Sequence, residues 1–208
     1  MVKVKVCGIT NLEDALAAVI AGCDALGFVF YKKSPRYIAP QKARQIIKLL
    51  PKRVAKVGVF VDMPAEKIKD IAKSCRLAIL QFHGRETPAF CEKFKRYRII
   101  KSFRIKDRID LAEVLKYHTF AYLFDTYVKS RPGGTGRRFN WKLLRGLGAI
   151  RKPLFLSGGL NYNNVLRAIR MVHPDWVDVS GSLESKPGKK DYYKIVRFVR
   201  RVKSKRSL

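Results

Sequence analysis

Two glycine-rich turns late in the sequence have the composition of an oxyanion site. The first is Gly158-Gly159 and the second is Ser180-Gly181-Ser182. Glycine lets backbone N–H groups approach an oxyanion closely, because no side chain stands in the way. A short helix start after the second turn would add its dipole. Either turn alone is typical of an ordinary tight turn, but together they predict phosphate binding by Gly158, Gly159, Ser180, Gly181 and Ser182.

The elements that would bring these turns together recur regularly along the chain. The expected strands span residues 2–6, 25–30, 54–61, 77–82, 98–103, 121–126, 153–158 and 176–181. Strands that are apolar on both faces and separated by helical patterns imply a parallel sheet covered by helices. Eight such units predict an α/β fold, a (βα)8 TIM barrel, in which residues 1–208 form a single catalytic domain.

Helix starts can be placed from their capping residues. Asn11 is expected to cap the helix after the first strand, with Asp14 three residues on, in the manner of a capping box. Pro64 is expected just inside the start of another helix, where proline is tolerated. Asn161 or Asn163 is expected to cap the helix after the seventh strand.

Polar residues fall where the expected strands end, which is the active-site face of a barrel of this kind. Cys7 follows the first strand, His83 the fourth and Arg104 the fifth, while Asp125 ends the sixth. The longest loop follows the sixth strand. Its run of three glycines and a threonine at 133–136 predicts a flap over the site.

The charge balance is extreme: 45 Lys and Arg stand against 16 Asp and Glu, a net charge of +29. Such a field attracts polyanions and speeds the approach of anionic substrates. The basic residues occur in nearly every segment, however, without an RNP, KH or zinc-finger pattern. We therefore expect solvated basic helix faces rather than a specific nucleic-acid site.

The four cysteines at positions 7, 23, 75 and 91 are widely spaced, with no CxxC pair. This spacing argues against a zinc site and against a secreted disulfide framework. No apolar run reaches the roughly 18 residues of a membrane span, and the N-terminal segment lacks the apolar region of a signal peptide. We expect a cytoplasmic protein without a metal or an association with membranes, and the sequence predicts no oligomeric state.

Several motifs, taken together, resemble the phosphoribosylanthranilate isomerase family of tryptophan biosynthesis. They are KVCGIT, GFVFYKKSPRYI, VGVFVD, LQFHG, FDT followed by GGTG, FLSGGLNYNNV and VDVS, in the family's order from Lys3 to about Glu184. The resemblance implies a cofactor-free Amadori rearrangement of N-(5-phosphoribosyl)anthranilate, a small phosphorylated substrate. The product is 1-(2-carboxyphenylamino)-1-deoxyribulose 5-phosphate.

The resemblance also implies roles for individual residues. Cys7 matches the general base, which removes the sugar C2′ proton, provided that positive surroundings lower its pKa. Asp125 matches the general acid, which protonates the furanose ring oxygen. Without this context, a lone Cys at a strand end is typical of packing, and an Asp before Thr of a turn.

Three further residues have weaker assignments. Arg36 matches the residue that pairs with the anthranilate carboxylate, for which a guanidinium fork is suited. Asp178 is a candidate for a substrate contact or for a residue behind the substrate. His83 is a weaker candidate for the same kind of contact, and the alternative for a single His after a strand is that it only braces loop backbone. The chain departs from the family in reading VDVSGSLE where VDVSSGVE is usual, so the geometry of that half of the phosphate site is in question.

Two other functions are compatible with a barrel of this composition. One is the related isomerase that acts on the aminoaldose phosphate of histidine biosynthesis, but that family has aspartate at the position of Cys7. The other is a basic nucleic-acid-binding protein, whose phosphate contacts would weaken steeply with salt.

Overall fold

The β-rich runs form a closed barrel in the computed structural model, which describes residues 1–126, 140–144, 147 and 150–204. The strands are β1 (Lys3–Cys7), β2 (Ala25–Val29), β3 (Ala55–Phe60), β4 (Ile79–Phe82), β5 (Arg98–Ile105), β6 (Ala121–Thr126), β7 (Leu154–Leu156) and β8 (Trp176–Val179). Each pairs in parallel with its neighbour, and β8 closes the ring against β1. The predicted TIM barrel is confirmed.

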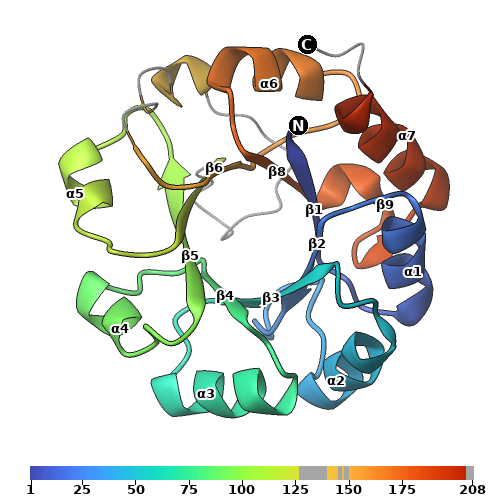
Figure 1. The fold of residues 1–208 in the computed structure, drawn as a ribbon, viewed down its shortest axis with the longest axis horizontal. Coiled ribbons are helices and arrows are strands. Elements are labelled where there is room, and N and C mark those ends of the chain that lie inside the picture. Colours follow the sequence, from blue (N-terminus) through green and yellow to red (C-terminus); the bar gives the residue numbers. More distant parts are fainter. Residues whose placement is uncertain (127–139, 145–146, 148–149, 205–208) are drawn as a thin grey trace.

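Helices cover the outside of this ring (Figure 1). They are α1 (Leu12–Ile20), α2 (Pro40–Leu49), α3 (Ala65–Ser74), α4 (Pro88–Glu92), α5 (Leu111–Leu115), α6 (Val165–Val172) and α7 (Tyr192–Lys203). In the described part of the sixth unit, the segment after β6 is the 3-10 helix η1 (Trp141–Leu144). The predicted flap at 133–136 lies outside the described residues.

The eighth unit carries an addition that the sequence did not predict. After β8 come the 3-10 helix η3 (Gly181–Leu183) and a small antiparallel hairpin of β9 (Glu184–Lys186) and β10 (Lys189–Lys190). The hairpin precedes α7 and contributes Glu184 and Lys190 to the site described below.

Capping follows the sequence closely at one helix and shifts at two others. The Asn11 side chain accepts the N–H of Asp14, and its amide donates to the Asp14 carboxylate, a variant of the capping box in which the backbone N–H of the cap would be the donor. Pro64 stands one residue earlier than predicted, immediately before α3. The N-cap of α6 is Asn164 rather than Asn161 or Asn163, and the Asn161 side chain instead accepts two backbone N–H groups in the turn before the helix.

The apolar side chains form two layers, one outside and one inside the barrel. Helix α6 shows the outer pattern: Val165, Ala168, Ile169 and Val172 are buried against the sheet, at the i, i+3, i+4, i+7 spacing of an amphipathic helix. A separate inner cluster consists of Ala25, Val57, Ile100, Ala121, Leu123 and Phe155. Phe155 stacks on Trp176 with ring centroids 4.8 Å apart.

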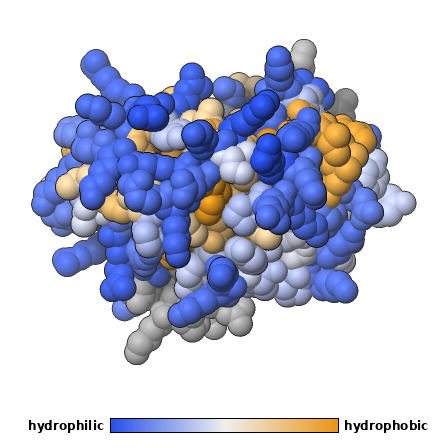
Figure 2. Space-filling view, turned by 90° about the horizontal axis from the view of Figure 1, so that it is seen from below, coloured by the Kyte–Doolittle hydropathy of each residue, from blue (hydrophilic) through white to orange (hydrophobic). Residues whose placement is uncertain are grey.

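The charged residues lie mainly on the outer surface. Figure 2 shows hydrophilic side chains over most of one side of the molecule, with smaller apolar areas between them. The described residues contain no helix that is long and apolar enough to cross a membrane.

Candidate active site

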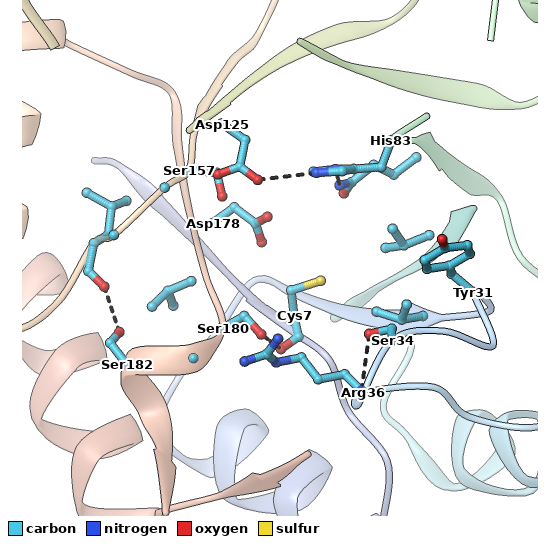
Figure 3. Close-up of a pocket in the computed structure, with 18 of the residues that line it drawn as sticks. Cys7, Tyr31, Ser34, Arg36, His83, Asp125, Ser157, Asp178, Ser180 and Ser182 are labelled. Carbon is cyan, nitrogen blue, oxygen red and sulfur yellow. Dashed lines mark hydrogen bonds and ion pairs between the residues drawn. The ribbon is translucent and has the colours of Figure 1, made fainter. Parts of the chain in front are cut away.

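A pocket of about 290 Å³ opens at the carboxyl ends of the strands. Its lining brings together every site residue that the sequence predicted: Cys7, Arg36, Asp125, Asp178, Gly158, Gly159, Ser180, Gly181 and Ser182. Figure 3 shows Asp125 and His83 facing each other on one side of this barrel-mouth pocket, with Cys7 and Arg36 on the other. The lining residues come from strands at both ends of the sequence, because the ring closes β8 against β1.

Cys7 is the last residue of β1, and its side chain is only 9 % exposed. It pairs in register with Gly27 of β2, where a Cβ would stand 2.7 Å from the Cys7 sulfur, so glycine makes room for the thiol. Burial raises the pKa of Cys7, and Asp178 adds to this, while the charges of Lys5 and Lys190 act in the opposite direction. The positive surroundings that a thiolate base requires are present, but in the direction of the shift burial outweighs them.

Asp178 forms a buried ion pair with Lys5, whose Nζ lies 2.8 Å from Oδ1. Lys5 precedes Cys7 by two positions on β1, and it is opposite Asp178 in the β1–β8 register. The two side chains therefore enter the barrel side by side. This pairing places Asp178 beside the candidate base as well as in the pocket lining.

His83 contacts the candidate acid, which favours the interpretation as a residue behind the substrate over one that only braces loop backbone. Its Nε2 lies 3.2 Å from Oδ2 of Asp125, and its Nδ1 lies 3.0 Å from the amide nitrogen of Gln81. An amide donor at Nδ1 leaves the imidazole proton on Nε2, which lies close to the carboxylate without the geometry of a hydrogen bond. The second oxygen of Asp125 accepts the backbone N–H of Thr126.

Arg36 is held by Glu184 in a fork. Its Nε and Nη2 donate to the two carboxylate oxygens at 2.7 and 2.8 Å. Lys190, fully buried, donates to the same carboxylate and to the carbonyl of Ser180. Although burial raises the pKa of Glu184, the hydrogen bonds and charges of Arg36 and Lys190 hold it below its ordinary value. One edge of the guanidinium is thus occupied, and Nη1 remains for a ligand in the pocket.

The two glycine-rich turns form the remaining wall. Gly158 and Gly159 have φ of 88° and 63°, a region that favours glycine. A Cβ on Gly158 would stand 2.3 Å from Oγ1 of Thr126. Ser180 and Ser182 donate their hydroxyls to the carbonyls of Cys7 and Leu160.

The groups of these turns that are available to a ligand are backbone N–H donors. Within the described part of the chain, the N–H groups of Gly159, Gly181 and Ser182 make no hydrogen bond. The arrangement can therefore bind an oxyanion through its backbone. The exchanged serine and glycine after β8 still form part of the pocket.

A family model supplies the observation that decides the family. The model of N-(5'-phosphoribosyl)anthranilate isomerase matches residues 4–201. The chain belongs to the phosphoribosylanthranilate isomerase family. A family member from Pelobacter propionicus is 49 % identical over 207 residues, which are 100 % of this chain and 98 % of the relative.

Solved structures of family members agree. The isomerase of Thermotoga maritima superposes with a TM-score of 0.91 at 45 % identity, covering 98 % of this chain and 99 % of that one. A second family structure, described as a complex with reduced 1-(o-carboxyphenylamino)-1-deoxyribulose 5-phosphate, superposes with a TM-score of 0.88 at 45 % identity and equal coverage.

Sequence reasoning missed four residues in or next to this pocket: Lys5, Gln81, Glu184 and Lys190. Lys5 was detectable, because it shares the inward face of β1 with Cys7. Glu184 and Lys190 stand on a hairpin that no motif indicated. Arg104, predicted after the fifth strand, lies inside β5 instead. Among the described residues, no group of three or more His, Cys, Asp or Glu could hold a metal ion.

Proposed function

We propose that this protein catalyses the Amadori rearrangement of N-(5-phosphoribosyl)anthranilate, as an aldose–ketose isomerase of tryptophan biosynthesis. The observation that carries the proposal is a single pocket lined by Cys7, Asp125, Arg36 and two turns rich in backbone donors. A base and an acid there come from β1 and β6, which β7 and β8 separate in the ring. A small sugar bound between them can lose a proton to the base on one side and receive one from the acid on the other.

Asp125 acts as the general acid. Protonated, it donates to the furanose ring oxygen, the bond from that oxygen to C1′ breaks, and a protonated Schiff base forms. His83, 3.2 Å from the same carboxylate, orients it toward the pocket. Asp125 is buried at the base of the pocket, where its charge interactions are stronger than they would be in bulk water.

Cys7 acts as the general base. Its thiolate removes the C2′ proton, and the electron pair moves to the Schiff base to give an enolamine. Protonation at C1′ and loss of the 2′-hydroxyl proton then yield the ketone. The protons lost and gained balance, so the reaction needs neither an oxidant nor a reductant.

Different residues bind the two ends of the substrate. Arg36 receives the anthranilate carboxylate on its free edge, since Glu184 occupies the other. Asp178 supports Lys5 beneath the sugar. The phosphate lies between the turns at Gly158-Gly159 and at residues 180–182, whose backbone donors are available.

Turnover of freshly prepared substrate by the purified protein tests the activity, with the aminoaldose phosphate of the histidine pathway as the second substrate. Cys7→Ala and Asp125→Asn should each lower kcat by at least about 100-fold with little change in KM, as expected for groups that act in the transition state. Cys23→Ala, at a buried thiol outside the pocket, is the control. Near-normal kcat in either test variant removes that residue from the mechanism.

Ligand binding tests the carboxylate end and the phosphate end of the site separately. Arg36→Met should weaken product binding by about 1.5–3 kcal/mol, and an analogue without the carboxylate should lose nothing further in this variant. Gly159→Asp and Gly181→Asp should abolish binding of a phosphorylated product analogue in calorimetry, with circular dichroism unchanged. Normal affinity in both glycine variants would place the phosphate elsewhere.

Cytoplasmic location and the lack of specific nucleic-acid binding remain predictions. The first is supported by four free, buried cysteines. Retention on DNA at physiological salt would contradict the second.

A further inference from the structure

A buried cation lies beside the thiol of Cys7, and the mechanism above gives it no part in the proton transfers. Lys5 has a side chain with no exposure to solvent, and it points into the barrel from the same strand face as Cys7. Burying an ammonium group without a partner is costly, so a lysine at this position requires an anion. Asp178 supplies one at 2.8 Å.

We propose that Lys5 is a positioning residue for catalysis: its ammonium, held by Asp178, is the counter-ion of the Cys7 thiolate. The proposal rests on the proposed role of Cys7 as the base. It assigns Asp178 mainly to keeping Lys5 charged and in place. No atoms are transferred to Lys5, which stays protonated throughout.

The neighbours of Cys7 favour Lys5 over other cations. Lys5 comes from β1 and Lys190 from β10, and both are buried. Lys190 already donates to Glu184 and to the carbonyl of Ser180. Lys5 has one hydrogen bond, to Asp178, among those described, so it has donors left for sulfur. Asp178 from β8 is the anion nearest to this cation; Asp125, His83 and Arg36 line the rest of the pocket.

The electrostatics agree with this geometry. Burial alone lowers the pKa of Lys5, but the charges and hydrogen bonds of Asp178 and Cys7 raise it above its ordinary value, so the ammonium persists. The Lys5 charge in turn opposes the effect of burial on the Cys7 thiol more strongly than Lys190 does. Removing Lys5 should therefore move the pKa of Cys7 further up.

The test measures the thiolate directly. Alkylation of Cys7 by neutral iodoacetamide is followed from pH 6 to 10, and peptide mass spectrometry separates Cys7 from the other three cysteines. Because the thiolate is the reacting form, the rate reports its fraction. Lys5→Met should lower the rate at neutral pH by about tenfold or more, which corresponds to one pKa unit, with recovery at alkaline pH. Lys56→Met changes a half-buried strand lysine outside the pocket, and its Cys7 should be alkylated at the same rate as in the protein without substitutions.

A double variant separates the loss of the cation from the exposure of a new anion. Lys5→Met alone leaves Asp178 uncompensated, which by itself raises the pKa of Cys7. Lys5→Met with Asp178→Asn removes both charges and avoids an unpaired buried ion. The shift should be smaller than in the single variant and in the same direction. Alkylation at the normal rate at every pH in the folded double variant overturns the proposal.

Turnover gives an independent readout. In Lys5→Met, kcat should fall at neutral pH and recover in part as pH rises, with KM little changed. If Cys7→Ala retains normal kcat, the proposed function of Cys7 fails, whereas the alkylation profile still decides whether Lys5 stabilises the thiolate.

Discussion

Two of the buried lysine–carboxylate pairs among the described residues have the same separation and different surroundings. Lys5 and Asp178 lie inside the barrel, and Lys101 and Glu86 lie between the outside of β5 and the loop after β4. In both pairs the nitrogen is 2.8 Å from the oxygen and both side chains are at most 6 % exposed. The two pairs are therefore alike in separation and burial, and they differ in their neighbours.

The outer pair makes its other hydrogen bonds with backbone groups. Lys101 also donates to the carbonyl of Gly84, and Glu86 accepts the N–H groups of Asp62 and Gly84. The inner pair instead has a thiol beside it and a second carboxyl group across the pocket. A buried ion pair whose remaining groups meet backbone fixes a loop, whereas one whose neighbours are ionisable sets their charge.

The largest expected effect is on stability, and it should be similar for both pairs. Lys5→Met and Lys101→Met each leave an unpaired buried carboxylate, so each should lower the free energy of unfolding by about 3–5 kcal/mol in urea titrations. The double variants Lys5→Met/Asp178→Asn and Lys101→Met/Glu86→Gln should regain part of the lost free energy of unfolding. Only the inner variants should shift the pH profile of kcat. A similar shift in Lys101→Met would refute the division of roles.

A pair of glycines sharpens the contrast between the two faces of the sheet. Gly27→Ala places a Cβ 2.7 Å from the Cys7 sulfur, and Gly58→Ala places one 2.6 Å from a methyl group of Leu77 on the outer face. Both should cost about 1–3 kcal/mol of stability through overpacking. Gly27→Ala should also lower kcat more than tenfold by displacing the thiol, and Gly58→Ala should not. Equal kcat values in steady-state assays would show that the thiol position is unimportant.

His83 provides a smaller effect within the inner region. His83→Asn removes the imidazole 3.2 Å from Asp125, so kcat should fall about tenfold while the substrate KM changes little. The exposed His118, replaced in the same way, serves as the control. An unchanged pH–rate profile in His83→Asn would mean that this imidazole does not orient the acid.

The smallest effect concerns Ser182. Its hydroxyl donates to the carbonyl of Leu160 and so ties the two phosphate turns together. Ser182→Ala should cost about 0.5–1.5 kcal/mol of stability and weaken the phosphorylated analogue slightly in calorimetry. Ser185→Ala, at a more exposed hydroxyl of the hairpin, should change neither. Loss of all ligand binding in Ser182→Ala would mean that the hydroxyl itself holds the phosphate.

The sequence by itself determined the barrel and most of the pocket lining. Periodicity marks β-strands and helices because it records which faces are buried, and a parallel barrel places all strand ends at one rim. Cys7, Asp125 and the two glycine turns follow from that rule. Their types were visible in the sequence, and family resemblance supplied their roles.

Only the tertiary structure decided how those residues are charged and held. The partners of Lys5 and Arg36 are 173 and 148 positions away along the chain, and no local pattern encodes such a distance. The pKa of Cys7 depends on burial and on three charges from three different strands, so the sequence could name the condition for a thiolate base but not whether it is met. Local periodicity fixes which side of a strand a residue faces, whereas its charge state depends on which distant groups share the same small volume.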